Sequence, residues 1–483
     1  MPPRERALRI AAVLLCAAVL ARFAVGCARI AAYPWDWDPG EGMFIDYAVR
    51  LLHAPRTLYP ADTVVPYPLV YTPLLPAVLA PVVAIWGASL PAARLVSCAF
   101  ALLALAAAFT LGRRAGGPLG GLLAAVLLAA PVGHSFWLVM LRADSPLIAL
   151  WLCAAVVILP ERLERGFAKL SWPRALAGAT LLVLCVLAKP TGALLGAPLV
   201  LGWPLVDVRS SARLAAATLL LGAAVFAALE IATGGGFWRC LSLQLIHPRI
   251  SDQRGRLLAG WTLRQGATLL LGAAALLWRA RQKEHPLRDG ATLLWLAGPV
   301  SLPLLDTSGA MFAYLLPWGC GQAVLVARWL GRNPMAQLAG SLLALAVASI
   351  QILPRPSPAD ELTAHSLYAF ALERGPPLLS TSTAYAYPLV GQPMEVEATS
   401  FAPFAAARLP GIEGVLDRVR AARYRTLIER TDAGRISTHA YSPAGRCEMG
   451  YFFGTAVLTL FVPGPARFVP AEGSRCAVLQ PVR

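Results

Sequence analysis

The chain has 483 residues, of which 57% are hydrophobic, and its mean hydropathy is +0.61. These values exclude an ordinary water-soluble domain and indicate a protein that crosses a membrane several times. Only 14% of the residues are charged, yet the net charge is +16. In a membrane protein, such an excess is typical of Lys and Arg in loops that fix orientation. Nucleic-acid binding is disfavoured because no basic stretch is interleaved with aromatic residues.

The N-terminus carries a basic segment, residues 2–9, followed by an apolar segment, residues 10–20. This is the charge pattern of a signal peptide, but no convincing small-residue cleavage site follows it. We therefore expect a retained signal anchor with its N-terminus in the cytoplasm.

Apolar runs long enough to cross a bilayer recur along residues 1–353. They cover residues 8–28, 93–112, 118–138, 146–160, 175–188, 192–206, 212–232, 260–278, 290–305, 311–328 and 336–353. Loops rich in Lys and Arg fall in every second gap, at residues 113–114, 161–174, 207–213, 279–288 and 328–332. The side that carries these cations is expected to face the cytoplasm. The pattern predicts a polytopic α-helical protein with about eleven transmembrane helices.

Residues 71–86 are apolar but are interrupted by Pro73, Pro76 and Pro81. If this segment crossed the membrane, every later loop would change sides, and Arg113 and Arg114 would face outward. We therefore expect an interfacial or re-entrant helix on the outer face, within a first outer loop that covers residues 31–92.

The first outer loop holds an acidic stretch in a chain that is poor in acid, Trp35-Asp36-Trp37-Asp38-Pro39-Gly40-Glu41-Gly42. Carboxylates beside a membrane are costly unless they are solvated, paired or functional. Pro39, Gly40 and Gly42 predict a turn that would fix Asp38 and Glu41 on a kink. Two interpretations stay open: a catalytic or substrate-binding acid pair, or acids that begin a helix over residues 43–52.

Three more charged residues lie at the predicted outer ends of spans. Arg142 and Asp144 either neutralise each other, with Asp144 available as a helix cap, or bind substrate. In the second case, Arg142 holds a phosphate or orients a carboxylate, and Asp144 binds a sugar hydroxyl or supports the acid pair. Lys189 ends an apolar run at a corner made by Pro190 and Gly192. It either snorkels to the interface or binds a phosphate.

Later outer loops add weaker candidates. His247 and Arg249 lie in a basic loop that would suit an anionic lipid headgroup or be simply solvated. Asp306 fills a turn with Ser308 and Tyr314, where it either caps a helix or binds substrate. His134 and His365 are isolated and are expected to be structural. Since no Cys/His cluster has metal-ligand spacing, no metal site is predicted, and the use of a divalent metal stays open.

The tail, residues 354–483, changes composition to polar turns and short apolar runs. We predict strands at residues 377–382, 424–429, 467–469 and 476–479 and a helix at residues 412–422, which gives a small α/β domain. Cys447 and Cys476 are the cysteines of this region, and they would be able to form a disulfide if the tail lies outside the cytoplasm.

Several short motifs, in order, are similar to one known family. They are Asp38-Pro39-Gly40-Glu41-Gly42, Leu58-Tyr59, Tyr67-Pro68, Tyr71-Thr72-Pro73-Leu74, Arg94-Leu95-Val96-Ser97, Arg142-Ala143-Asp144 and Ala188-Lys189-Pro190-Thr191-Gly192. Together they resemble the GT-C superfamily of polytopic glycosyltransferases, in particular the bacterial subgroup related to the protein mannosyltransferase and aminoarabinose transferase families. In the tail, Leu378-Leu379-Ser380, Gly391-Gln392-Pro393 and Tyr424-Arg425-Thr426-Leu427 are also similar.

The resemblance implies a catalytic acid in the first outer loop, juxtamembrane helices after it and a polyprenyl-phosphate sugar donor. Asp38 or Glu41 would be the general base. Arg142 and Asp144 match a second charged motif, and Lys189 matches a basic position. The chain departs from the family's commoner Asp-Glu doublet, which leaves open which acid is the base and whether a metal is used. It also lacks an Asn near residues 308–309 that relatives often have.

We therefore expect a hexosyl- or pentosyltransferase in the bacterial cytoplasmic membrane, with residues 1–353 as its catalytic transmembrane module and residues 354–483 outside the cytoplasm. It would move a sugar from a polyprenyl-phosphate donor to a lipid, glycan or protein acceptor. One alternative is a transporter or flippase of lipid-linked sugars, which predicts charges near mid-span, where only Arg22 and Glu230 stand. The other is a non-catalytic membrane scaffold. The sugar, the acceptor and the oligomeric state stay open.

Overall fold

The structure is a computed structural model of the whole chain. It describes residues 2–159, 169–202, 207–246, 249–250, 252–281, 290–307, 312–331, 333–351, 356–396, 401–430, 440–451, 454–463 and 468–479.

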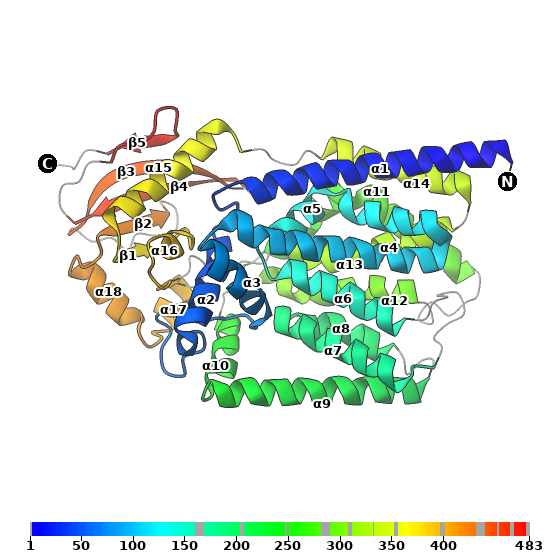
Figure 1. Cartoon of the computed structure of the whole chain (residues 1–483), viewed down its shortest axis with the longest axis horizontal. Helices are drawn as coiled ribbons and strands as arrows, with labels where there is room; N and C mark the ends of the chain where they lie inside the picture. Colours follow the sequence, from blue (N-terminus) through cyan, green and yellow to red (C-terminus); the bar gives the residue numbers. More distant parts are fainter. Residues whose placement is uncertain are drawn as a thin grey trace.

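Apolar helices lie side by side and form a bundle along the long axis of the molecule (Figure 1). They are α1 (Pro3–Ala32), α4 (Leu90–Ala129), α5 (Val132–Val139), α6 (Asp144–Ile158), α7 (Trp172–Ala188), α8 (Gly192–Leu201), α9 (Val208–Ala232), α11 (Gln253–Arg281), α12 (Gly290–Ala297), α13 (Leu316–Leu330) and α14 (Pro334–Ile350). The 3-10 helices η6 (Gly298–Asp306) and η7 (Phe312–Leu315) follow α12 and precede α13. Each helix overlaps a predicted apolar run, but α4 covers two runs, and the run 118–138 is divided between α4 and α5.

Length and hydropathy identify fewer spans than the sequence pattern predicts. Among the described residues, three helices are long and apolar enough to cross a membrane: α1, residues 90–114 of α4, and α9. A fourth span is possible if residues 116–129 and 133–139, bent by 85°, act as one. The other runs are shorter apolar helices of 10–17 residues. A mostly helical membrane-like fold is confirmed, while the number of eleven spans stays a prediction.

The long helix α4 is a hairpin that reverses at Gly117, whose φ is +73°. Its two arms touch so closely that a Cβ on Gly112 would lie 2.6 Å from the carbonyl oxygen of Gly120. The first arm contains the predicted run 93–112, and the second covers only residues 118–129 of the predicted run 118–138, whose remainder lies in α5. Near the turn, the guanidinium of Arg114 donates to the carbonyl oxygen of Val156, 2.7 Å away at the end of α6. The cations of the turn therefore lie at the end of the bundle opposite the start of α4.

Residues 33–89 stay at one end of the bundle, where α1 ends and α4 begins (Figure 1). They form α2 (Glu41–His53), η1 (Pro55–Thr57) and α3 (Leu74–Trp86), and α3 packs against α2. With 13 residues, α3 is about 20 Å long, too short for a hydrocarbon core of about 30 Å. The helix α3 lies within the predicted segment 71–86, and its interfacial placement stays a prediction.

The tail is a mixed α/β unit at the same end of the molecule (Figure 1). It contains α15 (Pro358–Arg374), α16 (Ala386–Leu389), α17 (Phe401–Ala406), α18 (Ile412–Arg420) and the strands β1 (Leu378–Ser380), β2 (Thr426–Arg430), β3 (Ser442–Tyr451), β4 (Gly454–Val462) and β5 (Cys476–Val478). The strand order is β1-β2-β4-β3-β5, with β1 parallel to β2 and every other pair antiparallel.

The small C-terminal sheet is confirmed, and β1, α18, β2 and β5 coincide with predicted elements. Two results differ from the prediction. The strand expected at residues 467–469 is wrong, since Phe468 and Val469 have no strand conformation. The longest pair, β3 and β4, was not predicted.

The buried apolar residues form two large cores. One fills the helical bundle, and the other joins the tail to the first loop, with Phe44 and Val64 packed in the same cluster as Tyr368 and Leu427. Because this second core contains residues of both the first loop and the tail, burial of its apolar surface holds the loop and the tail together.

Candidate functional site

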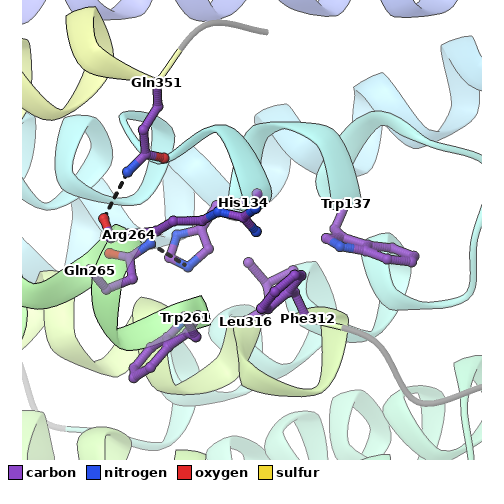
Figure 2. Close-up of a pocket in the computed structure, with 9 residues that line it drawn as sticks. His134, Trp137, Trp261, Arg264, Gln265, Phe312, Leu316 and Gln351 are labelled. Atoms are coloured by element: carbon purple, nitrogen blue, oxygen red, sulfur yellow. Dashed lines mark hydrogen bonds between the residues drawn. The ribbon is translucent and has the colours of Figure 1, made fainter. Parts of the chain in front are cut away.

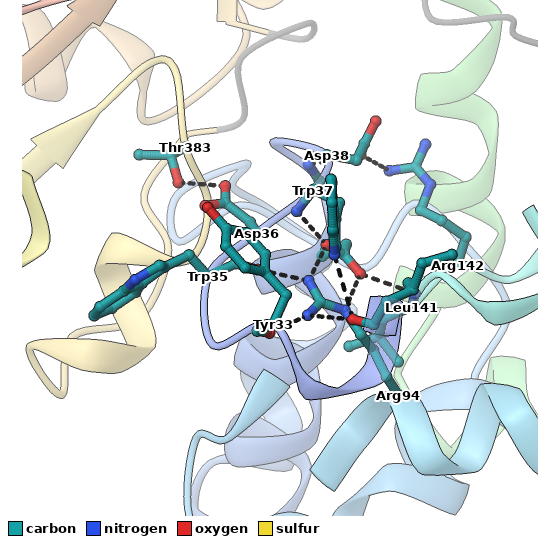
Figure 3. A network of polar contacts seen from close by, with 12 residues as sticks. Tyr33, Trp35, Asp36, Trp37, Asp38, Arg94, Leu141, Arg142 and Thr383 are labelled. Carbon is teal, nitrogen blue, oxygen red and sulfur yellow. Dashed lines mark hydrogen bonds and ion pairs between the residues drawn. The ribbon is translucent and has the colours of Figure 1, made fainter. Parts of the chain in front are cut away.

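The acidic stretch between α1 and α2 is a tight turn with Asp38 at its centre. The backbone N–H of Gly40 donates to Asp38 Oδ1 at 2.9 Å, and the N–H of Glu41 donates to the Asp38 carbonyl oxygen at 3.0 Å. Arg142, on the short segment between α5 and α6, pairs with the same Oδ1 at 3.0 Å (Figure 3). The Asp38 and Arg142 side chains are 9% and 16% exposed, so the pair is nearly buried.

Glu41, three residues later, has a different environment. Its side chain is fully buried and forms a two-point ion pair with Arg94 of α4, at 2.8 Å to Oε1 and 2.6 Å to Oε2. The backbone N–H groups of Trp37 and Leu141 donate to the same carboxylate, at 2.7 Å and 3.0 Å. Four donors therefore occupy the two carboxylate oxygens.

Arg94 is a partner that the sequence reasoning missed. It also donates to the carbonyl oxygens of Ile30, Tyr33 and Trp35, at 3.2, 2.5 and 2.7 Å (Figure 3). This guanidinium ties the end of α1 to the acidic turn. The available signal was an Arg near the start of an apolar run, where an unpaired cation is expensive.

A second ion pair lies beside the first, because Asp144 follows Arg142 by two residues and begins α6. Its Oδ1 is 2.7 Å from Nζ of Lys189, which ends α7, and both side chains are 6% exposed. The N-terminus of α6 favours the carboxylate through the helix dipole. The Lys189 ammonium also lies 4.2 Å from the ring centre of Tyr314, a cation–π contact.

Tyr71, which the sequence analysis quoted only as part of a motif, lies near enough to Arg142, Lys189 and Asp144 for their charges to influence its hydroxyl. Burial raises the pKa of Tyr71, so its hydroxyl stays protonated at neutral pH and is able to donate a hydrogen bond. Sequence reasoning had no reason to choose this tyrosine among twelve.

The remaining predicted residues form a separate group on the connections around α11. Asp306 pairs with Arg254, and its carbonyl oxygen accepts from the N–H of Ile250 at 2.7 Å. Arg249 forms an isolated β-bridge with Thr307. No contact between this group and Asp38 is found among the described residues. His247, Ser308 and Gly309 lie outside the described residues.

The two isolated histidines have neighbours in the described structure. His134 is buried, and its ring lies 3.3 Å from both the Leu128 carbonyl oxygen and the Gln265 amide. The ring of His365 lies 6.0 Å from that of Trp35. Within the described parts of the chain, no group of three or more His, Cys, Asp or Glu residues could hold a metal ion.

The tail holds the acidic turn directly through Asp36. This carboxylate accepts hydrogen bonds from the hydroxyls of Tyr368 and Thr383, the latter at 2.9 Å (Figure 3). The ring of Tyr368 also stacks on Trp35, with centroids 5.2 Å apart. Burial raises the pKa of Asp36 to about 7, although these hydrogen bonds lower it in part.

No model of a known protein family matches the chain, and no curated protein matches its sequence. Solved structures do match its fold. Apo ArnT from Cupriavidus metallidurans superposes with a TM-score of 0.59 at 14% identity, over 92% of this chain and 97% of that chain. The same protein bound to undecaprenyl phosphate gives 0.59 at 13% identity over the same shares. The apo oligosaccharyltransferase of Archaeoglobus fulgidus gives 0.53 at 12%, over 96% of this chain and 76% of that chain.

The matched structures span both the helical bundle and the tail, as their coverage of this chain requires. The bundle and the C-terminal α/β unit thus superpose together on these structures. This chain therefore has the fold of the GT-C glycosyltransferases.

Proposed function

We propose that the chain transfers a hexose or pentose from a polyprenyl-phosphate donor to a lipid, glycan or protein acceptor on the outer face of the bacterial cytoplasmic membrane. The observation that carries this proposal is the adjacency of the Asp38–Arg142 and Asp144–Lys189 pairs at the tail-bearing end of an apolar bundle. The match to ArnT bound to undecaprenyl phosphate supports a lipid-linked donor.

In this proposal, Asp38 is the general base and Glu41 is structural. The Asp38 side chain keeps 9% exposure, whereas the Glu41 side chain has none and its oxygens are occupied by Arg94 and two backbone N–H groups. Arg142 pairs with the Asp38 carboxylate and fixes its direction. The carboxylate accepts the proton of the acceptor's hydroxyl or amine as that group attacks the anomeric carbon.

The leaving group is the lipid phosphate. The bond from the anomeric carbon to the acceptor forms while the bond to the phosphate oxygen breaks, and the electron pair leaves with the phosphate. Lys189 is a nearly buried cation beside the protonated hydroxyl of Tyr71, and the two would stabilise the developing charge. Asp144 holds the ammonium in place.

The outer location rests on the tail. Cys447 on β3 and Cys476 on β5 form a disulfide, with their Cα atoms 4.1 Å apart. Disulfides persist in oxidising compartments and are rare in the cytoplasm, which favours the tail end of the molecule, and hence Asp38, facing outward.

The first test is Asp38→Asn, assayed in membranes that contain radiolabelled polyprenyl-phosphate sugars. We expect transfer of label from the carrier to fall by about 100-fold or more, because the base is lost while the side-chain volume is kept. Asp62→Asn is the matched control, since Asp62 is an exposed acid of the same loop. Thermal unfolding of both variants in detergent should match that of the wild type.

Full transfer by Asp38→Asn would contradict its assignment as the base. Label that crosses the membrane while still attached to its carrier would instead support the flippase alternative.

A further inference from the structure

Tyr71 differs from other groups around the two ion pairs in how its backbone is held. Asp144 begins α6 and Lys189 follows the end of α7, so regular helices fix both positions. Trp137, whose ring centre lies 6.0 Å from the guanidinium of the first pair, belongs to α5 (Figure 2). Tyr71 instead lies within residues 58–73, which are neither helix nor strand, and its position therefore depends on contacts from other segments.

Two side chains hold the backbone at Tyr71. The hydroxyl of Tyr59 donates to the Tyr71 carbonyl oxygen at 2.9 Å, and the amide of Gln244 donates to the Val70 carbonyl oxygen at 3.4 Å. Tyr59 is buried, and burial raises the pKa of its hydroxyl, so the hydroxyl keeps the proton that it donates. Because a peptide group is planar, holding two successive carbonyl groups also fixes the direction in which the side chain of Tyr71 leaves the backbone.

Both supports depend on the connection between α9 and α11. This connection contains α10 (Gly236–Ser242) and η4 (Leu243–Ile246), and α10 lies between the end of α9 and the first loop (Figure 1). Gln244 belongs to η4. In α10, the ring of Phe237 meets the ring of Tyr59 edge to face, with centroids 5.2 Å apart.

Polar and close backbone contacts attach α10 to the loop beside Tyr59. The guanidinium of Arg239 donates to the carbonyl oxygens of Pro60 and Thr63, each at 3.1 Å. A Cβ on Gly236 would overlap the carbonyl oxygen of Tyr59, so glycine is needed for this approach. The helix α10 is therefore fixed to the part of the first loop that carries Tyr59.

We infer that Tyr59 and Gln244 are positioning residues for Tyr71, and that α10 and η4 thereby keep the Tyr71 hydroxyl beside the two ion pairs. Neither residue acts on the substrate itself. Each acts on the leaving phosphate through Tyr71, whose hydroxyl must already point at the developing charge in order to stabilise it. The effect on transfer rests on the proposed function, whereas the support of Tyr71 by these contacts does not.

The first test measures transfer from a radiolabelled polyprenyl-phosphate sugar at several donor concentrations, so that kcat and KM are obtained separately. Tyr59→Phe removes one hydroxyl and keeps the ring, and we expect kcat to fall about fivefold. KM should stay within about twofold of wild type, because the leaving oxygen gains its charge only in the transition state. Gln244→Met should lower kcat less, by about threefold, because its hydrogen bond is the longer of the two.

Tyr47→Phe is the matched control. Its hydroxyl donates to the Pro68 carbonyl oxygen at 2.8 Å, so the same kind of bond is lost from the same stretch. Between that bond and Tyr71, the N–H of Leu69 donates to the Leu58 carbonyl oxygen at 2.7 Å and anchors the chain independently. We therefore expect Tyr47→Phe to leave kcat unchanged.

Positioning through Tyr71 also predicts that the effects of two substitutions are not additive. Tyr71→Phe removes the hydroxyl itself and should lower kcat about tenfold. On that background, Tyr59→Phe should change kcat by less than about twofold, since no hydroxyl is left to position. A loss of the same size on both backgrounds would overturn the inference, and so would equal losses in Tyr59→Phe and Tyr47→Phe.

Hydrogen exchange on the detergent-solubilised full chain separates this inference from the proposed function, because it requires no transfer. Peptides that cover residues 69–73 should take up deuterium faster in Tyr59→Phe than in Tyr47→Phe, and peptides that cover β2 should be unchanged in both. If the wild type transfers no sugar, faster exchange at residues 69–73 would retain the support of Tyr71 and reject the proposed function. If the wild type is active, unchanged exchange in Tyr59→Phe would reject that support and retain the proposed function.

Discussion

Asp38 and Glu41 are three residues apart, yet the different surroundings of their carboxylates indicate different roles. Asp38 pairs with the Arg142 guanidinium and accepts from the backbone N–H of Gly40, and its side chain keeps 9% exposure. Glu41 is surrounded by four donors at zero exposure. The first arrangement orients a carboxylate that is not completely buried, and the second fixes the backbone of the turn that carries it.

Breaking the Glu41–Arg94 pair should therefore damage folding. Arg94→Met would leave the Glu41 carboxylate buried without its cation, which costs about 3–5 kcal/mol. We expect a strongly lowered midpoint of thermal unfolding in detergent. The double variant Arg94→Met/Glu41→Gln should recover part of that loss, because the orphaned charge is gone.

The comparison with Asp38→Asn gives the control. That variant should unfold at the wild-type temperature while losing transfer. A normal unfolding temperature for Arg94→Met, or a larger loss of stability for Asp38→Asn, would reverse the roles given to the two acids.

At the residue scale, the sequence identified the charged residues of the candidate site, but it did not identify the residues with which they pair. The acids of the first loop, Arg142, Asp144 and Lys189 are recognisable because charge is rare in this chain. Their pairing is set by contacts across 53, 104 and 45 residues. No local pattern encodes such contacts, and therefore Glu41 and Asp38 were indistinguishable in the sequence.

At the scale of elements, the tail contacts the first loop directly at the acidic turn. The N–H of Ala384 donates to the Pro39 carbonyl oxygen at 3.0 Å, immediately beside Asp38. A Cβ on Gly42 would lie 2.2 Å from Cα of Tyr385, so only glycine allows this approach. Together with Asp36, these contacts make the tail a positioning element for the turn.

The contact of Asp36 with the tail should make the stability of the folded chain depend on pH. Burial raises the pKa of Asp36 to about 7 from its ordinary value of 3.8. The folded chain thus keeps a proton that the unfolded chain releases, and the resulting stability is present below pH 4 and is lost as the pH rises through 7. The difference is on the order of 4 kcal/mol.

Asp36→Asn removes this titration while keeping a group that is able to accept from Tyr368 and Thr383. We expect the wild type to lose stability relative to Asp36→Asn as the pH rises from 4 to 7, with little further change above pH 8, because the pKa of Asp36 is about 7 in the folded chain. Thermal unfolding of both proteins across this range measures the difference, and other titrating groups cancel in the comparison. Parallel pH profiles would show that Asp36 does not titrate in this range.

Helices of the bundle were predictable from the sequence because apolar runs bounded by charges and prolines are a strong signal. The strands of the tail were only partly so. β4 is a nearly continuous apolar run without a period of two, and β3 contains Pro443, Gly445 and Gly450 and has a register shift between Pro443 and Gly445. β3 and β4 are strands because they pair with each other, and this pairing cannot be predicted from either segment alone.

At the scale of the whole molecule, the candidate site and the basic turn of α4 lie at opposite ends of the helical bundle. The acidic turn, α2, α3 and the tail share one end, and the turn of α4 with Arg113 and Arg114 lies at the other. The sequence predicted this separation from the alternation of basic loops. The proposed donor requires it too, since a lipid-linked sugar replaces a nucleotide sugar only where nucleotides are absent.

The orientation in the membrane is tested by labelling single cysteines in intact spheroplasts with an impermeant maleimide, after removal of the seven free native cysteines. Suitable positions are exposed: Asp62 in the first loop, Arg113 at the α4 turn and Arg420 in the tail. Positions such as Gly40 are unsuitable, because a Cβ there would lie 2.1 Å from Arg142.

We expect cysteines at 62 and 420 to label in intact spheroplasts and the one at 113 to label only after permeabilisation. The reverse pattern would place Asp38 in the cytoplasm, where nucleotide sugars are present and the disulfide would be reduced, and would contradict the proposed donor. Labelling of 62 without 420 would contradict the core that joins the first loop to the tail. That core holds the first loop and the tail on the same side of the membrane. Cysteines at positions 62 and 420 must therefore be labelled under the same conditions if the tail contacts the acidic turn.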